Sequence, residues 1–296
     1  MYILLQLKLY FMSTFEAVLA QYEKNKQATS GNSNKVSQED RMKKYFTTLL
    51  PKGSKGEERR IRILPTKDGS SPFVEVYFHE VQVDGKWMKI YDPKQEGKRS
   101  PLNEVYEGLM MTGVESDREL ARQYRSRKFY IVKVIDRDNE QDGPKFWRFK
   151  HNAKGDGVLD KIFPIFRNKG DVTDISKGRD LILSLALTKA GTGKEYTTIN
   201  SVIPEDAGPL HEDEKVGQGW VNDELTWSDV YSKKGEDYLE MVAKGEVPIW
   251  DSVSNKWTSR DGSTSDEIIS SPKTTKATKP VADPQEEDEV DDNLPF

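Results

Sequence analysis

Aromatic and cationic residues are interleaved in three segments whose composition favours β-strands. These segments are Tyr124–Tyr130, Phe146–Lys150 and the two flanks of a turn near residue 192. Single-stranded nucleic acid binds where bases stack on aromatic rings while nearby cations hold the phosphates. The pattern therefore predicts a nucleic-acid groove. The predicted contact residues are Arg59, Arg62, Trp87, Tyr124, Arg125, Arg127, Lys128, Phe129, Tyr130, Trp147, Arg148, Phe149, Lys150, Lys189, Lys194 and Tyr196.

Core packing is the alternative explanation for each of these aromatic residues. Successive residues of a strand point to opposite faces, so Trp147 and Phe149 share one face. Phe146 and Arg148 share the other, and one of the two faces must turn toward the core. For any single aromatic residue we favour core packing, whereas for the clusters as a set we favour a groove.

Catalytic chemistry is not indicated. A phosphate-binding loop at Gly191–Lys194 would need a glycine at Thr188 and a serine or threonine at Glu195, so a hairpin turn is the better explanation. The three histidines are scattered, and no nucleophile with an adjacent base is evident. We therefore expect no enzymatic activity. A nuclease is the last alternative, since no paired carboxylates suggest a metal site.

Short strands must position the interleaved residues. Arg59–Leu64 and Phe73–His79 alternate in polarity, and Val81–Met88 contains a hairpin signal at Asp84-Gly85. Two further hairpins are expected, Phe129–Ile135 with Lys145–Phe149 and Leu181–Leu187 with Tyr196–Val202. Helices are expected near Leu102–Met111, Ser116–Tyr124, Val158–Phe166, Asp223–Lys233 and Gly235–Lys244. The fold class is therefore mainly β with inserted helices (α+β), and the many short strands suggest a small antiparallel barrel.

Composition indicates that parts of the chain do not pack into a core. Hydrophobic residues make up 35% of the 296 residues and charged residues 32%. The absence of cysteine excludes disulfides and thiolate zinc sites. The expected organisation is an N-terminal arm at 1–44, a nucleic-acid-binding core at 45–210, a short helical extension at 211–258, a linker at 259–282 and an acidic tail at 283–296.

The first eleven residues are apolar, but they are too few to span a bilayer. They lack the basic start and the small-residue cleavage site of a signal peptide. We favour an extension from an upstream start, with Met12 as the more natural first residue. An apolar arm that binds a partner is the alternative.

The last fourteen residues form the acidic tail, which ends on Leu294-Pro295-Phe296. Seven of them are acidic and none is basic, so repulsion predicts a disordered, solvated segment. The whole chain carries a net charge of −5, so the remaining residues are mildly basic. An apolar anchor on an acidic peptide predicts a partner with a basic-rimmed apolar pocket. The predicted partner-binding residues are Asp291, Asp292, Leu294, Pro295 and Phe296, and a disordered end without a partner is the alternative. The tip resembles that of bacterial single-stranded DNA-binding proteins.

Residues 45–205 resemble the T-even phage single-stranded DNA-binding proteins, the helix-destabilising proteins of phage replication. The resemblance is carried by Ile61–Lys67, Pro72–Val74 with His79, Asp84–Trp87, Tyr130–Asp138 and Trp147–Phe149. It implies an oligonucleotide-binding barrel with a cleft lined by aromatic and basic side chains. It also implies a basic arm for cooperative self-association, a core for DNA and an acidic tail for replication and recombination proteins.

Two departures from the family pattern affect what the resemblance implies. The family core holds a structural zinc ion through one histidine and three cysteines, and His79 matches that histidine. Asp92, Ser100 and Asn103 stand where the cysteines would be, so we expect no zinc ion and no other cofactor. The basic motif of the family's arm is also absent. Lys24–Ser30 matches that motif only in part, so the resemblance gives weaker support for cooperative self-association.

The resulting expectation is a phage protein that coats and protects single-stranded DNA during replication, recombination and repair, without strong sequence preference. It would recruit partners through its tail. There are two alternatives. One is a translational regulator that binds RNA, and the other is a protein-interaction scaffold in which the aromatic residues form the core. We expect the protein in the cytoplasm of the infected bacterial host, with no membrane partner.

Overall fold

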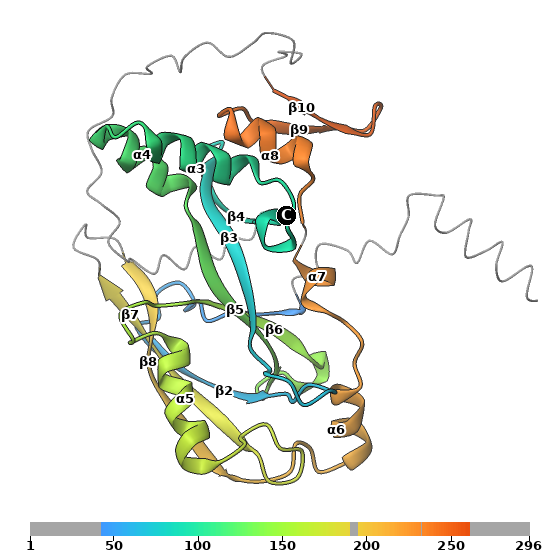
Figure 1. Ribbon diagram of the computed structural model, residues 1–296. Coiled ribbons are helices and arrows are strands. Elements are labelled where there is room, and N and C mark those ends of the chain that lie inside the picture. The colour runs from blue at the N-terminus through green and yellow to red at the C-terminus, as the bar shows by residue number, and fades with distance from the viewer. Residues whose placement is uncertain (1–42, 190–194, 232, 261–296) are drawn as a thin grey trace, which may run out of the picture. The chain divides into compact units, whose positions relative to one another are not determined.

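The structure is a computed structural model that describes residues 43–189, 195–231 and 233–260 (Figure 1). Its largest element is an eight-stranded sheet. Its strands are β1 Tyr45–Phe46, β2 Gly56–Ile63, β3 Val74–Val83, β4 Lys86–Tyr91, β5 Ser126–Asp136, β6 Lys145–Lys150, β7 Arg179–Lys189 and β8 Glu195–Ala207. Strands β9 Pro248–Asp251 and β10 Lys256–Ser259 form a separate two-stranded sheet. The helices are α3 Pro101–Met111, α4 Glu115–Tyr124, α5 Val158–Lys169, α6 Glu214–Val221, α7 Trp227–Val230 and α8 Glu236–Ala243, with short 3-10 turns η1 Pro93–Glu96 and η2 Glu140–Asp142.

The three predicted hairpins are confirmed. Strand β3 pairs with β4, β5 with β6, and β7 with β8, all antiparallel. At the first turn Asp84 and Gly85 have φ values of 53° and 75°. Two positive φ values in a two-residue loop are the conformation that Asp-Gly favours. This turn fixes the β3–β4 register and therefore determines which side chains face each other.

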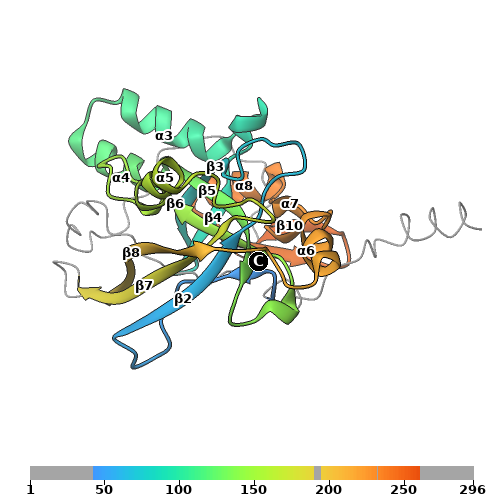
Figure 2. The ribbon, with the colours of Figure 1, turned by 90° about the horizontal axis from the view of Figure 1, so that it is seen from below.

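The order β1-β6-β5-β2-β7-β8 describes the main path of the sheet, with β3 attached to β5 and β4 to β3. Figure 1 shows β3 and β5 as long neighbouring strands, and Figure 2 shows β2, β7 and β8 side by side. Within the described residues this sheet is not closed, because no ladder joins β8 to β1. The two-residue strand β1 already pairs with β6, so it offers little backbone for a second ladder. The mixed α+β class is confirmed, but the closed barrel is not seen.

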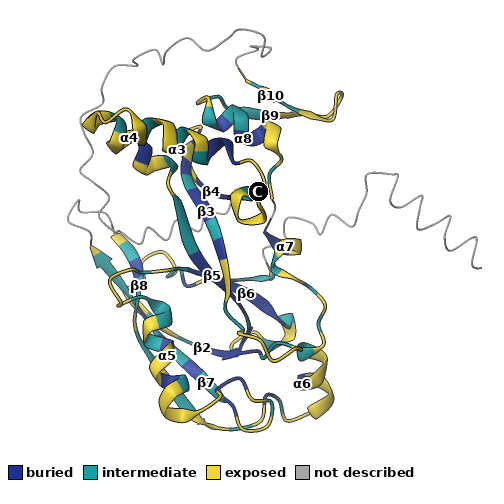
Figure 3. Ribbon diagram, in the orientation of Figure 1, coloured by how far each residue is buried: buried dark blue, intermediate teal, exposed yellow. Residues whose placement is uncertain are grey.

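A main core lies between the inner side chains of the curved sheet and helix α5. It contains Ile61 and Ile63 of β2, Val132 of β5, Leu183 of β7 and Ile162 of α5. Strands β5 and β6 are among the most buried parts of the molecule (Figure 3). Alternation in β2 explains this arrangement, because every second residue of the strand points inward.

The C-terminal helices pack on separate smaller clusters. Leu239 of α8 lies in a cluster with Val81, Met88 and Leu102, whereas Val230 of α7 packs with Phe78. The helix predicted at Asp223–Lys233 is confined to the four residues of α7, and α6 was not predicted. In the described part of the chain, no helix is long and apolar enough to cross a membrane.

Candidate nucleic-acid interface

Strand register places one set of polar side chains on the same face of β3, β4, β5 and β6. Glu80 pairs with Lys89 and Gln82 with Trp87 in the β3–β4 ladder, while Phe78 pairs with Arg127 in the β3–β5 ladder. Phe129, two residues beyond Arg127, pairs with Lys150 of β6. Directly opposed residues share a face, and so do residues two apart along a strand. We call the set Trp87, Lys89, Glu80, Arg127 and Lys150 the charged face.

Three cations of the charged face surround one carboxylate. Glu80 Oε2 lies 3.3 Å from Arg127 Nε and 3.1 Å from Lys150 Nζ. Lys89 faces Glu80 from the neighbouring strand. Burial by itself would raise the pKa of Glu80, but the charges of Lys150, Lys89 and Arg127 outweigh burial and lower the pKa. The carboxylate is therefore ionised at neutral pH, and the group keeps an excess of positive charge.

Trp87 supplies an aromatic ring beside these cations. Its side chain is 38% exposed, which distinguishes it from the buried aromatic residues of β5 and β6. It lies two residues from Lys89 on the same face of β4, a separation of about 7 Å along a strand. An exposed ring next to cations is the arrangement that binds a base and its neighbouring phosphates.

The segment that contains α7 covers the other end of the same sheet face. The hydroxyl of Tyr45 donates a hydrogen bond of 3.0 Å to the Val230 carbonyl, and Lys133 Nζ donates one of 3.0 Å to the Asp223 carbonyl. The guanidinium of Arg148 lies 4.8 Å from the ring centroid of Tyr231 and 5.2 Å from that of Phe78. Arg148 is thus half-buried between rings rather than open to a ligand on this face.

Five predicted contact residues lie in the interior, which corrects their assignment to an open groove. Tyr130, Trp147 and Phe149 belong to the main core, and Phe129 packs with Val76 and Phe78. The last of the five is Arg62. The alternation of β5 and β6 was predicted correctly, but both of their faces are covered along much of their length. Fewer of the predicted aromatic residues are therefore open to a ligand than the sequence suggests.

Arg62 is buried because its partners come from distant segments. Its guanidinium lies 3.1 Å from Asp180 Oδ1 and donates hydrogen bonds of 2.9 Å to the carbonyls of Asp174 and Gly208. Arg59 is engaged in a similar way, with Nη2 donating to the Leu49 carbonyl at 2.9 Å and Nη1 to that of Thr47. Both arginines tie loops to β2.

Three more predicted contacts lie at the end of α4, at the junction with β5 and within β5 itself. Arg125 is exposed, while Tyr124 is half-buried, and burial raises the pKa of its phenol. Lys128 lies on the face opposite to the charged face, where its Nζ is 3.0 Å from Glu75 Oε2. The structure therefore separates Lys128 from Arg127, its neighbour in the chain.

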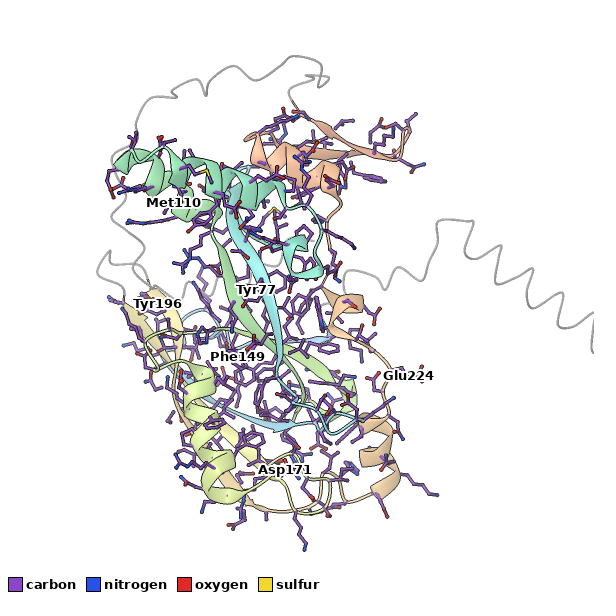
Figure 4. The ribbon with its side chains drawn as sticks, in the orientation of Figure 1. Tyr77, Met110, Phe149, Asp171, Tyr196 and Glu224 are labelled. Carbon is purple, nitrogen blue, oxygen red and sulfur yellow. The ribbon has the colours of Figure 1, made fainter. Side chains whose placement is uncertain are left out.

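The third predicted cluster lies on another hairpin. Lys189 is exposed and lies 3.3 Å from Glu195 across the β7–β8 ladder. Tyr196 is half-buried near the start of β8, where Figure 4 shows it apart from Phe149. Lys194 lies outside the described residues, as do the N-terminal arm at 1–42 and the partner-binding residues of the acidic tail.

Sequence reasoning missed Glu80 and Lys89. Both sit on strands that were predicted, and the two-residue turn at Asp84-Gly85 sets their pairing. Counting outward from this turn would have placed them opposite each other and on the same face as Trp87. The signal was present in the hairpin register.

The residues at the family's zinc positions form a hydrogen-bonded cluster. His79 Nδ1 donates to the Tyr124 carbonyl at 2.7 Å, and Nε2 lies 3.3 Å from both Ser100 Oγ and Asp92 Oδ1. Burial alone would raise the pKa of Asp92, but hydrogen bonds with His79 and Ser100 lower it. Because Asp92 precedes η1 and Ser100 precedes α3, the cluster ties both elements to β3.

This cluster fits neither a zinc site nor a catalytic triad. Both ring nitrogens of His79 already have protein partners, and Asn103 donates instead to Glu107 at 2.7 Å. Among the described residues, no group of three or more histidine or carboxylate side chains is placed to hold a metal ion. A hydrolytic triad needs the acid and the hydroxyl on different ring nitrogens, whereas here both contact Nε2 in the interior.

Comparison with known families agrees with a nucleic-acid interface. A family model described as gp32 DNA binding protein like matches residues 55–240 of the chain. The match covers more than half of the 296 residues and includes the whole charged face. No curated protein gives a significant match to the chain.

Proposed function

Because the chain belongs to the gp32-like family of DNA-binding proteins, a family without enzymatic activity, we propose that its charged face binds and coats single-stranded DNA. The observation that carries this proposal is the convergence of Arg127, Lys150 and Lys89 beside the exposed ring of Trp87. Cations there would hold phosphates while Trp87 stacks on a base. The contact would have little sequence preference, since every base offers a π-face.

Preference for the single strand would make the protein helix-destabilising. A ligand that binds one state and not the other shifts the equilibrium by mass action. Bases in a duplex are stacked on each other and do not expose their faces to Trp87. The protein would therefore favour melting of the duplex and protect the strands that melting exposes.

Further contacts would extend the interface beyond the charged face. Arg125 precedes Arg127 by two residues, and Lys189, Lys194 and Tyr196 belong to the β7–β8 hairpin. We include them as candidate contacts. An oligonucleotide-binding fold is also part of the proposal. It is supported by the curved sheet around one core and by the Leu50 N–H, which donates to Thr197 Oγ1 at 3.3 Å between the segment after β1 and strand β8.

Roles in replication, recombination and repair follow from the resemblance to phage proteins. The acidic tail, residues 283–296, would compete with DNA for the charged face and recruit partner proteins once DNA has displaced it. The arm at 1–44 would support self-association, and the cytoplasm of the infected host is the expected location. Deleting residues 283–296 should then tighten DNA binding, whereas unchanged or weaker binding would contradict the competition.

RNA is the alternative ligand, because stacking and phosphate contacts do not read the 2′-hydroxyl. Tryptophan quenching during titration with poly(dT), poly(U) and duplex DNA at two salt concentrations tests the proposal. We expect strong, salt-sensitive quenching by poly(dT) and little by the duplex. Stronger quenching by poly(U) would favour a translational regulator, and no response to any nucleic acid would favour a protein scaffold.

A further inference from the structure

Glu80 occupies the centre of the charged face, where cations from three strands meet. Arg127 comes from β5, Lys150 from β6 and Lys89 from β4. Arg127 and Lys150 both approach the same oxygen, Oε2, at 3.3 and 3.1 Å. One carboxylate thus pairs directly with two of these side chains, and Lys89 faces it across the β3–β4 ladder.

The Glu80 carboxylate offers these cations the same kind of ligand as a phosphate does. Both groups are anionic oxygen acceptors for guanidinium and ammonium donors. Because the three cations exceed the single carboxylate, the cluster can accept a second anion. The side chains of Arg127, Lys150 and Glu80 are 26%, 20% and 17% exposed, so an approaching phosphate can reach the cluster from solvent.

We propose that Arg127, Lys150 and Lys89 form a phosphate subsite. The carboxylate of Glu80 competes with phosphate for these cations and so lowers the affinity of the subsite for each bound phosphate. This inference rests on the proposed binding of single-stranded DNA. A coating protein must leave the strand when other proteins need it, and an internal anion keeps that release fast. The negative charge of Glu80 therefore sets the affinity of the face as well as the positions of its cations.

A matched pair of substitutions tests this role. Glu80→Gln and Glu75→Gln remove the same charge from the same strand, but Glu75 pairs with Lys128 on the opposite face. Affinity for a fluorescent dT oligomer is measured at several salt concentrations, together with thermal unfolding. We expect Glu80→Gln to tighten binding about fivefold, the worth of one unit charge a few ångströms from a phosphate in water. The salt slope should steepen by up to about 0.7.

The outcomes separate this inference from the proposed function. If the unaltered protein does not bind the oligomer, the proposed function fails. If it binds and both glutamine variants tighten binding equally, only net charge matters and the role of Glu80 is overturned. A larger effect of Glu75→Gln would move the phosphate subsite to the other face of the sheet.

A second pair covers the case in which Glu80→Gln does not fold. Lys89 and Lys86 lie on the same strand, β4, but they point to opposite faces, since they are three positions apart. Lys89→Gln should weaken binding about fivefold, while Lys86→Gln should change it less than about twofold. Equal effects of the two lysine substitutions would remove Lys89 from the subsite.

Discussion

The two faces of the β5–β6 hairpin both contain aromatic residues, but they have different environments. On one face Tyr130, Trp147 and Phe149 enter the main core, whereas on the other Arg127 and Lys150 remain partly open around Glu80. Both faces carry aromatic residues with cations nearby in the chain. Distant segments make the difference, because α5, β2 and β7 cover the first face and α7 covers only part of the second. Clusters of aromatic residues therefore indicate binding only where nothing else packs on them.

Truncating an aromatic side chain of the packed face should cause the largest loss of stability. Trp147→Ala removes a side chain that is 1% exposed and should lower the free energy of unfolding by about 3–5 kcal/mol. Denaturant unfolding measures this change. DNA affinity of the molecules that remain folded should be unaltered, so a loss of affinity without a loss of stability would show that Trp147 contacts DNA.

Removing Arg62, the buried cation of β2, should lower stability slightly less than Trp147→Ala does. Arg62→Met deletes one cationic partner of Asp180 and should cost about 3 kcal/mol of stability, near the lower end for a broken buried pair. The cost is limited because Arg137 still lies 2.8 Å from Asp180 Oδ2. Arg60→Met is the control, since half of that side chain is exposed and its loss should cost about 1 kcal/mol or less. Equal costs would contradict a structural role for Arg62.

The sequence predicts the strands of both faces better than it predicts their exposure. Alternation and turn residues identify β2 to β8, and pairs such as Trp147 and Phe149 are assigned to the correct common face. What covers a face is decided by contacts between segments far apart in the chain, such as Tyr45 with Val230. Arg62 illustrates the same limit. Its position on an alternating strand suggests exposure. Its burial is explained by partners more than a hundred residues later in the chain, the Asp180 carboxylate and the carbonyls of Asp174 and Gly208.

Removing the exposed ring of the charged face tests whether Trp87 contributes to DNA affinity. Trp87→Ala should weaken binding of a dT oligomer by about 1–3 kcal/mol, the value of one stacked base. Trp250→Ala is the matched control, because Trp250 is 48% exposed on β9, outside residues 55–240. Its loss should leave affinity unchanged. Equal losses would place the stacking contact elsewhere.

The salt dependence of DNA affinity tests most directly whether the charged face holds phosphates. Lys150→Gln on this face is compared with Lys128→Gln on the opposite face, both on dT oligomers over a range of salt. If Lys150 neutralises one phosphate, its substitution should make the slope of log affinity against log salt shallower by about 0.7. Lys128→Gln should leave the slope unaltered. A shallower slope for Lys128→Gln alone would contradict phosphate binding by the charged face and assign DNA to the other face of the sheet.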